Sequence, residues 1–278
     1  MFYNYSVTIF AKQFITTMNL INSLNNQRIK DLVKLQKTSE RRAQQLIIID
    51  GAREIESAKK SGVELLELFY CPGLVKKEIK DFFGLSQEKI TETTEVVFKK
   101  ICYKENPDGY FALAKMKLIG LDKIKLSNNP LLVILEAVEK PGNLGAIIRT
   151  SYAAGVDAII INDSQTDIYN PNVIRASEGF VFNKPIVTAS VEETADWLRS
   201  NKILSYAAAT TGKNNYTKEK LSSPTAIILG SEAYGLSDKW LKRADKLIKI
   251  PMEKGIDSLN VSVSAAVILY EVLRQRKK

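Results

Sequence analysis

The stretch LLVILEAVEKPGNLGAIIRTSYAAGVDAIIIN, residues 131–162, contains a strand, a turn, a helix and a second strand in close succession. Its two apolar runs, 131–138 and 157–162, are rich in Ile, Leu and Val, which is typical of parallel strands covered on both faces. The Pro-Gly turn leads into a helix that we expect Asn143 to cap. Two such strands joined by a helix are the repeating unit of an open α/β sheet. The stretch therefore predicts that fold.

The same alternation continues toward the C-terminus. Further apolar runs predict strands at 185–189, 203–210, 226–230 and 246–250. The final segment, LNVSVSAAVILYEVLRQRKK, is a helix with apolar residues on nearly every face, so one sheet can cover only part of it. A twofold interface would cover the remainder with a single patch used twice. We therefore expect a homodimer built on this helix, with Leu269 or Leu273 facing outward.

A smaller α/β block precedes this sheet. We expect it to span residues 18–118, after an extension at 1–17 and before a linker at 119–130 that is rich in Gly, Ser, Asn and Pro. The C-terminal domain then covers residues 131–278. Within the block, the patterns predict strands at 44–50, 64–70, near Lys89 and at 109–116, and helices at 51–62, 76–83 and 93–101.

The chain is basic, with 40 Lys and Arg against 31 Asp and Glu and a net charge of +9. The first 126 residues hold 21 of these cations and 15 of the acids. At the start of the block, Arg28, Lys30, Arg41 and Arg42 are candidate contacts to a polyanion such as RNA. A solvated helix face would show the same charge run. Composition leaves both interpretations open.

Missing residue types exclude several classes of enzyme. The chain has no histidine, which excludes Ser-His-Asp and Cys-His nucleophiles, HExxH zinc sites and histidine bases. Cys71 and Cys102 are not spaced as CxxC, so we expect no metal and a reducing compartment. Neither GxGxxG nor GxxxxGK[ST] occurs, which disfavours a Rossmann oxidoreductase and a P-loop NTPase. No membrane span or signal peptide is recognisable, and we expect a cytoplasmic protein without a membrane partner.

Three strand-to-helix junctions are unusually polar for their apolar surroundings. Open parallel sheets bind ligands where the carboxyl ends of strands meet the amino ends of helices. Each polar residue has an ordinary explanation as a cap, a turn or a surface residue, and only the combination indicates a site. The residues are Asn143 and Arg149 after the first strand, Glu232 in LGSEAYGLSD (229–238), and Ser258, an expected helix cap, with Asn260 in IPMEKGIDSLNVSVSAA (250–266).

Taken together, the junctions resemble the three motifs of the SpoU/TrmH family of RNA ribose 2′-O-methyltransferases, within the SPOUT superfamily. The matching pieces are EKPGNLGAIIRTSYAAGVDAIII, IILGSEAYGLS and IPMEKGIDSLNVSVSAAVILYEVLRQR. The first block, with NQRIKDLVKLQKTSERRAQQLIIIDGAREIESA and ENPDGYFALA, is similar to that family's ribosomal-protein-like RNA-binding domain. The resemblance implies a parallel sheet with a deep trefoil knot, S-adenosylmethionine as cofactor and a homodimer.

The resemblance also implies roles for individual residues. Arg149 would contact the phosphate beside the target ribose and stabilise the developing alkoxide, because a guanidinium stays protonated and is a poor base. The candidate catalytic residues are Asn143, Arg149, Glu232, Ser258 and Asn260, and the candidate cofactor-binding residues are Gly230, Ile250, Leu259 and Thr210.

The implied reaction is methylation of a ribose 2′-hydroxyl, with 23S rRNA as the expected substrate. A tRNA substrate and a non-catalytic RNA-binding homologue remain the alternatives. All five polar motif positions are occupied by the residues that the family uses, which argues against loss of activity.

Overall fold

The computed structural model describes residues 19–277, and the expected extension at 1–17 lies outside them. The chain divides into two compact units between Met116 and Lys117. The stretch 119–130, expected to be a linker, belongs to the second unit, because Leu121 and Ile124 pack against its core. Within the described residues, no helix is both long enough and apolar enough to cross a membrane.

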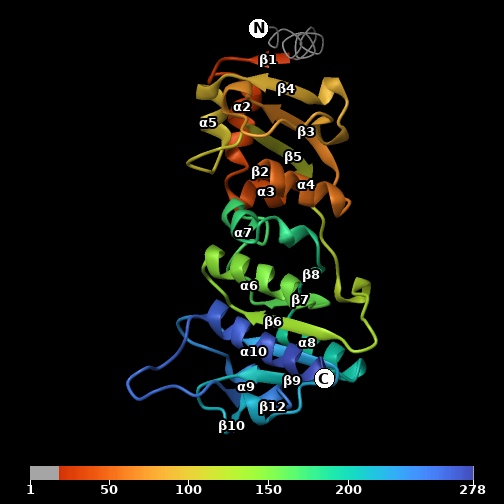
Figure 1. Ribbon diagram of the computed structural model, residues 1–278, viewed down its shortest axis with the longest axis vertical. Coiled ribbons are helices and arrows are strands. Elements are labelled where there is room, and N and C mark those ends of the chain that lie inside the picture. The colour runs from red at the N-terminus through yellow and green to blue at the C-terminus, as the bar shows by residue number, and fades with distance from the viewer. Residues whose placement is uncertain (1–18, 278) are drawn as a thin grey trace, which may run out of the picture. The chain divides into compact units, whose positions relative to one another are not determined.

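The first unit is built on a five-stranded mixed sheet with the order β1-β4-β3-β5-β2 (Figure 1). Strand β5 runs antiparallel to β3 and β2, while β1, β4 and β3 are parallel. The strands are β1 Asn19–Ile21, β2 Leu46–Asp50, β3 Leu65–Tyr70, β4 Ile90–Thr93 and β5 Tyr110–Lys115. The helices are α2 Gln27–Lys34, α3 Thr38–Gln44, α4 Ala52–Lys60 and α5 Glu95–Ile101, with 3-10 turns at Pro72–Leu74, Phe82–Gly84 and Gln87–Lys89.

The four strands predicted for this unit are confirmed, but the helix predicted at 76–83 is wrong. The chain there forms bends and the 3-10 turn, with Phe83 in the left-handed region at φ 57°. Phe83 is buried edge-on against Tyr110, with ring centroids 5.7 Å apart, and the Tyr110 hydroxyl accepts a hydrogen bond from the Ile79 N–H at 2.9 Å. These tertiary contacts outweigh the helical preference of a charged segment.

Arg41, expected to contact RNA, is fully buried instead. Its guanidinium donates to the carbonyl oxygens of Leu35 and Gln36, both at 2.8 Å, and to the hydroxyl of Thr38 at 3.0 Å. The side chain therefore satisfies carbonyls just beyond the C-terminus of α2, which would otherwise lack partners. Because its donors are occupied and covered, Arg41 is not available to a phosphate.

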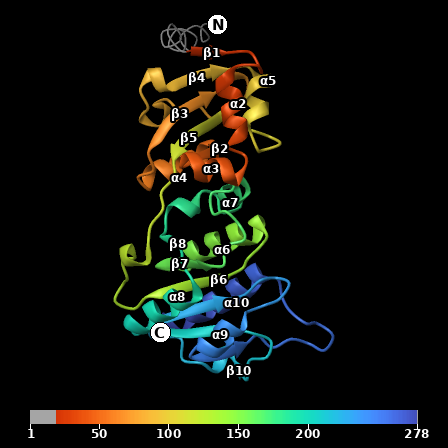
Figure 2. The ribbon, with the colours of Figure 1, turned by 180° about the vertical axis from the view of Figure 1, so that it is seen from behind.

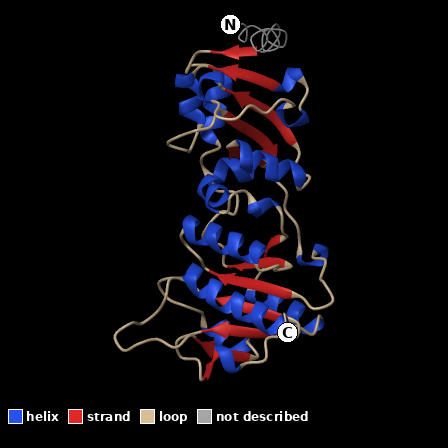
Figure 3. Cartoon of the chain, in the orientation of Figure 1, coloured by secondary structure: helices blue, strands red, loops and turns tan. Residues whose placement is uncertain are grey.

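The second unit is built on a seven-stranded parallel sheet with the order β10-β12-β9-β11-β6-β7-β8 (Figures 1 and 3). Every strand predicted there is confirmed, and only the two-residue β10 was not predicted. The strands are β6 Leu131–Glu136, β7 Ala158–Asn162, β8 Ile186–Thr188, β9 Leu204–Ala208, β10 Asn214–Asn215, β11 Thr225–Leu229 and β12 Lys246–Lys249. The α-helices are α6 Pro141–Ala153, α7 Pro171–Ala176, α8 Val191–Ser200, α9 Asp238–Arg243 and α10 Val261–Arg276.

Helices cover this sheet on both faces, as the continuously apolar strands require (Figures 1 and 2). Trp240 of α9 is fully buried beneath α8, and its indole N–H donates to the Asn162 side chain at 3.0 Å. The Asn162 amide in turn donates to the Thr194 hydroxyl at 2.8 Å. Strand β7 is thus joined to both helices by satisfied polar contacts in an apolar core.

Helix α10 crosses the sheet and is fixed at both ends. At its start, the Asn260 side chain accepts a hydrogen bond from the Ser262 N–H at 2.9 Å. At its end, the Arg276 guanidinium donates to the carbonyls of Asn129, Pro130 and Ser223 at the amino edge of the sheet. Leu269 is fully buried, so the expectation that it faces outward is wrong, and Leu273 is half-buried.

Strand order and pairing do not determine how loops thread, so the trefoil knot stays a prediction. Strands β12, β9, β11 and β6 are parallel neighbours, so the chain must cross from one edge of the sheet to the other before each of β9, β11 and β12 begins. The loops that follow β9, β11 and β12 therefore all emerge at one edge of the sheet.

The burial of Arg41 predicts that its removal destabilises the first unit far more than removal of Arg42 does. Arg41→Ala should lower the free energy of unfolding of the first unit by roughly 2–3 kcal/mol, because it strips charged donors from buried carbonyls. Arg42→Ala should change it by less than about 0.5 kcal/mol, since Arg42 is exposed. Urea denaturation followed by circular dichroism would measure both. Equal effects of the two substitutions would contradict the structural role of Arg41.

Candidate active site

The three polar junctions meet at the carboxyl edge of the second sheet. Strands β6 and β11 are paired in register from Leu131 with Thr225 to Leu135 with Leu229, so they end at the same level. The loop after β6 enters α6, and the loop after β11 runs beside it. The start of α10 completes the group. Of the four other catalytic candidates, Glu232 and Asn260 contact Asn143, whereas Ser258 and Arg149 do not join this group.

Asn143, Glu232 and Asn260 form a continuous chain of hydrogen bonds. The Asn143 amide donates to Glu232 Oε1 at 2.6 Å, and the Asn260 amide donates to Asn143 Oδ1 at 3.2 Å. Asn260 Oδ1 accepts from both the N–H and the hydroxyl of Ser262. Three segments that are far apart in the sequence are therefore held together by side-chain amides and one carboxylate.

Two expected helix caps are wrong. Helix α6 begins at Pro141 with Lys140 as its N-cap, so Asn143 lies within the first turn and its side chain is directed to Glu232. Proline is favoured at the first helical position because it has no N–H to satisfy. Helix α10 is capped by Asn260 and not by Ser258, which lies exposed in the preceding loop.

Glu232 is half-buried, and two opposing effects act on its pKa. Burial raises the pKa, but hydrogen bonds from the Asn143 amide and from the backbone N–H groups of Glu232, Glu139 and Lys140 lower it. The net pKa lies below the ordinary 4.5. Glu232 is therefore a carboxylate at neutral pH, and it acts as a hydrogen-bond acceptor that orients Asn143.

The loop that carries Glu232 is tightly closed. Ser231 and Gly235 exchange two backbone hydrogen bonds, each 3.0 Å long. A Cβ at Gly230 would collide with the backbone of Gly235 and Leu236, so only glycine fits there. Buried Glu136, the last residue of β6, accepts hydrogen bonds from the N–H and hydroxyl of Ser237 at 2.8 and 2.6 Å. This carboxylate ties the far end of the loop to the sheet.

The four expected cofactor positions lie in loops at the same edge. Thr210 follows β9, Gly230 follows β11 and Ile250 follows β12, and these three strands are neighbours. Leu259 lies just before Asn260 with 37% of its surface exposed. Nearly every residue of the loop 250–260 is exposed. The four positions therefore lie at neighbouring strand ends and in an uncovered loop beside them.

Arg149 is not part of the Asn143 chain. Its guanidinium pairs with the Glu178 carboxylate at 2.8 Å, and 55% of its side chain is exposed. Next to it, Tyr152 stacks on Phe180 with ring centroids 4.2 Å apart. Glu178 was missed by sequence reasoning. Its only signal is the Gly179 that follows it, which marks a turn beyond α7 and gives no hint of the partner.

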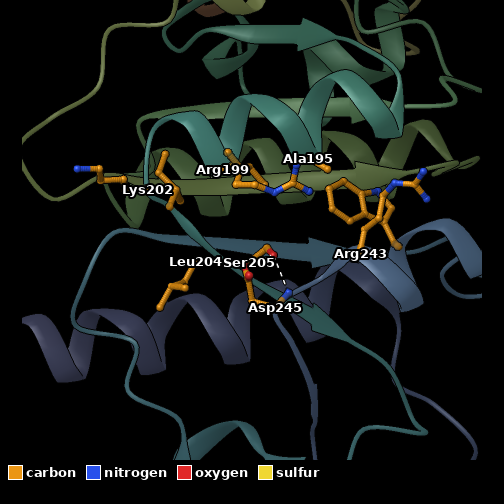
Figure 4. Close-up of a pocket in the computed structure, with 10 residues that line it drawn as sticks. Ala195, Arg199, Lys202, Leu204, Ser205, Arg243 and Asp245 are labelled. Carbon is orange, nitrogen blue, oxygen red and sulfur yellow. Dashed lines mark hydrogen bonds between the residues drawn. The ribbon is translucent and has the colours of Figure 1, made fainter.

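A separate cavity of about 220 Å³ opens at the opposite edge of the sheet (Figure 4). It lies between α8 and α9 at the amino end of β9, and Asp245 bonds to Ser205 on its wall. Arg199 and Arg243 on its rim are each near an acidic side chain, Asp196 and Glu192. The cavity is therefore remote from the Asn143 chain and is not part of the candidate active site.

The lowered pKa of Glu232 predicts how stability depends on pH. Glu232→Gln should lower the free energy of unfolding of the second unit by roughly 1 kcal/mol at pH 7, because a carboxylate acceptor is lost. The difference in free energy of unfolding between the native protein and the variant should be largest above pH 4.5. It should shrink below that pH, as the Glu232 carboxylate of the native protein becomes protonated. Denaturant titrations at several pH values would measure it. Glu253→Gln, in the exposed loop, is the control, and an equal loss there would refute the assignment.

Comparison with known proteins places this geometry in a family. Residues 130–270 match the SpoU rRNA Methylase family, and residues 26–112 match the MRM3-like substrate binding domain. A 23S rRNA (guanosine(2553)-2′-O)-methyltransferase of Bacillus subtilis (strain 168) is 29% identical over 263 residues, which cover 92% of this chain and 99% of that relative.

Solved structures agree with this assignment. A crystal structure of an RNA 2′-O ribose methyltransferase is 38% identical, with a TM-score of 0.82, and covers 93% of this chain and all of that one. An AdoMet-bound rRNA methyltransferase from Sinorhizobium meliloti is 27% identical, with a TM-score of 0.84, over 92% of this chain and 98% of its own. The chain therefore belongs to the SpoU rRNA methylase family.

Proposed function

We propose that this chain transfers a methyl group from S-adenosylmethionine to a ribose 2′-hydroxyl of 23S rRNA in the cytoplasm. The observation that carries the proposal is the intact Asn143–Glu232–Asn260 chain at the carboxyl edge, within the region that matches the family. The choice of rRNA as substrate and of S-adenosylmethionine as cofactor is supported by the similar proteins, which are rRNA or RNA 2′-O-methyltransferases and an AdoMet-bound rRNA methyltransferase. A homologue that had lost activity would have no need to keep this polar chain assembled.

S-adenosylmethionine, when bound, supplies an activated methyl group, so the protein need only orient the 2′-oxygen and help remove its proton. We propose that backbone groups at Gly230, Ile250 and Leu259 hold the cofactor, with Thr210 at the neighbouring strand end. Asn143 and Asn260 then face the ribose, and the exposed Ser258 can reach into the same space from its loop.

Glu232 and Arg149 are both poor candidates for the base. Glu232 has a pKa below 4.5 and stays ionised at neutral pH, so its affinity for a proton is low. A guanidinium stays protonated in proteins and cannot accept a further proton. Arg149 instead contacts the phosphate next to the target ribose, where that phosphate replaces Glu178 as the partner of the guanidinium. The proton leaves to water or to phosphate.

The first unit supplies further contacts to RNA. Its match to a substrate-binding domain and its excess of cations support this role. Lys30 and Arg42 are exposed, and Lys34, one turn after Lys30, lies on the same side of α2. Arg28, in contrast, pairs with both Glu67 oxygens, at 2.9 and 2.7 Å. We therefore assign RNA contacts to Lys30 and Arg42 ahead of Arg28.

A homodimer is the proposed assembly. Although Leu269 is buried, α10 still exposes apolar surface at Val263 (47%) and Tyr270 (55%), which lie seven residues apart and so on one face. Helix α6 contacts α10 and exposes Tyr152 beside Arg149. A second copy seated on this face would bury the apolar stripe and lie close to Arg149 of its partner.

The reaction predicts a specific defect for Arg149→Ala. Incubation with methyl-labelled cofactor and ribosomal RNA should place label on ribose with the native protein. Arg149→Ala should lower that rate by about 100-fold or more, while cofactor affinity measured by calorimetry stays nearly unchanged. Arg199→Ala, at the opposite edge, is the matched control. Label found only on bases would refute the reaction, and a parallel loss of cofactor affinity would refute the role of Arg149.

The assembly predicts that charge on the exposed face of α10 splits the dimer. Val263→Asp and Tyr270→Asp should each raise the dimer dissociation constant by about 10-fold or more, since each buries a carboxylate at the interface. Sedimentation velocity would detect the shift toward a 31.1 kDa monomer. Leu204→Asp, exposed at the amino edge, should leave the dimer intact. A native protein that sediments as an active monomer at micromolar concentration would rule the dimer out.

A further inference from the structure

Tyr234 projects from the same loop as Glu232 and is 89% exposed. Among the large apolar side chains within residues 19–277, this exposed fraction is the highest; the next are Val96 at 66% and Leu118 at 64%. An aromatic ring left in water forgoes its main contribution to stability. The fold thus gains little from a ring at this position, and a role outside folding is the better explanation.

The backbone beneath the ring is rigid. The Tyr234 N–H donates to the Ser231 hydroxyl at 3.0 Å, inside the turn that Ser231 and Gly235 close with two backbone bonds. Gly235 takes φ 69°, which lets the chain turn back directly after the ring. Because the backbone is held, binding of a flat ligand need order only the two side-chain torsions of Tyr234.

The position of the ring relative to the Asn143 chain suggests the ligand. Tyr234 is two residues from Glu232, so their Cα atoms lie within about 7 Å. Glu232 bonds directly to Asn143. A nucleotide whose ribose lies against Asn143 would therefore have a base, its own or that of its neighbour, within reach of the ring.

Resting on the proposed function, we propose that Tyr234 is a stacking platform for an RNA base within one nucleotide of the methylated ribose. Every base offers an aromatic face, and stacking on aromatic side chains is a general means of holding unpaired RNA. Stacking there would fix the nucleotide against rotation and hold its ribose at the Asn143 amide. Tyr234 is thus a positioning residue, distinct from the groups that touch the reacting oxygen.

Three substitutions separate stacking from other roles of the ring. Tyr234→Ala and Tyr234→Leu should each lower kcat/KM for ribosomal RNA by about 5- to 150-fold, and Tyr234→Phe should restore most of the loss because it keeps the ring. Cofactor affinity and sedimentation should match the native protein in all three. Leu204→Ala, an exposed apolar residue at the other edge of the sheet, is the control for an unrelated surface change.

A double-mutant cycle that combines Tyr234→Ala with abasic RNA identifies which base stacks on the ring. A short RNA containing the methylated site is prepared with an abasic nucleotide at that site or at either neighbour. At one position the abasic RNA should weaken binding to native protein about as much as Tyr234→Ala does. The two changes together should then cost no more than one alone, because they remove the same contact.

Several outcomes would overturn the inference. Native rates for Tyr234→Ala, full activity for Tyr234→Leu, or additive losses at all three abasic positions would each show that no base stacks on the ring. A parallel loss of cofactor affinity would assign the ring to the cofactor, and a shift to monomer would assign it to the dimer. If the native protein labels no ribose, the proposed function fails too; native labelling with an unchanged Tyr234→Ala defeats the stacking role alone.

Discussion

The in-register parallel pairing of β6 with β11 is the constraint on which the rest of the site depends. Since both strands end at the same level, the residues that follow them are neighbours in space although they are about ninety positions apart in sequence. The Asn143–Glu232 bond then needs only short side chains. Glu136 and Gly230 reinforce the arrangement, one by holding the far end of the loop and the other by admitting its close turn. If one of these strands shifted by one residue against the other, its side chains would turn to the opposite face of the sheet. Asn143 and Glu232 would then no longer meet.

Sequence patterns predicted most of the second sheet because continuous apolar runs have few other uses in a chain of this composition. The polar edge followed from the same rule, since parallel strands direct their carboxyl ends one way. What remained hidden depended on partners far away in sequence. The helix expected at 76–83 gave way to packing of Phe83 on Tyr110, and no local pattern encodes that contact. Arg41 belongs to the same run of charges as Arg42, yet one is buried and the other exposed.

The site itself was predicted in part. The resemblance named Asn143, Glu232 and Asn260 among five catalytic candidates, and these three side chains are joined by hydrogen bonds. The caps were misassigned because Ser and Asn compete for the same role at helix starts, and the choice depends on where the helix begins. Arg149 illustrates a different limit. Its guanidinium pairs with Glu178, which follows α7, and nothing in the sequence around Arg149 indicates that contact.

Helix α10 gives the C-terminus an influence that its distance from the site would not suggest. Asn260 at one end belongs to the polar chain, whereas Arg276 at the other fastens three carbonyls at the opposite edge of the sheet. The sixteen-residue helix between them is about 24 Å long. Loss of the Arg276 guanidinium alone would release this end of the helix from all three carbonyls. The first turn of α10, which carries the Asn260 amide, would then be held less firmly, so a change at the amino edge of the sheet would affect the carboxyl edge.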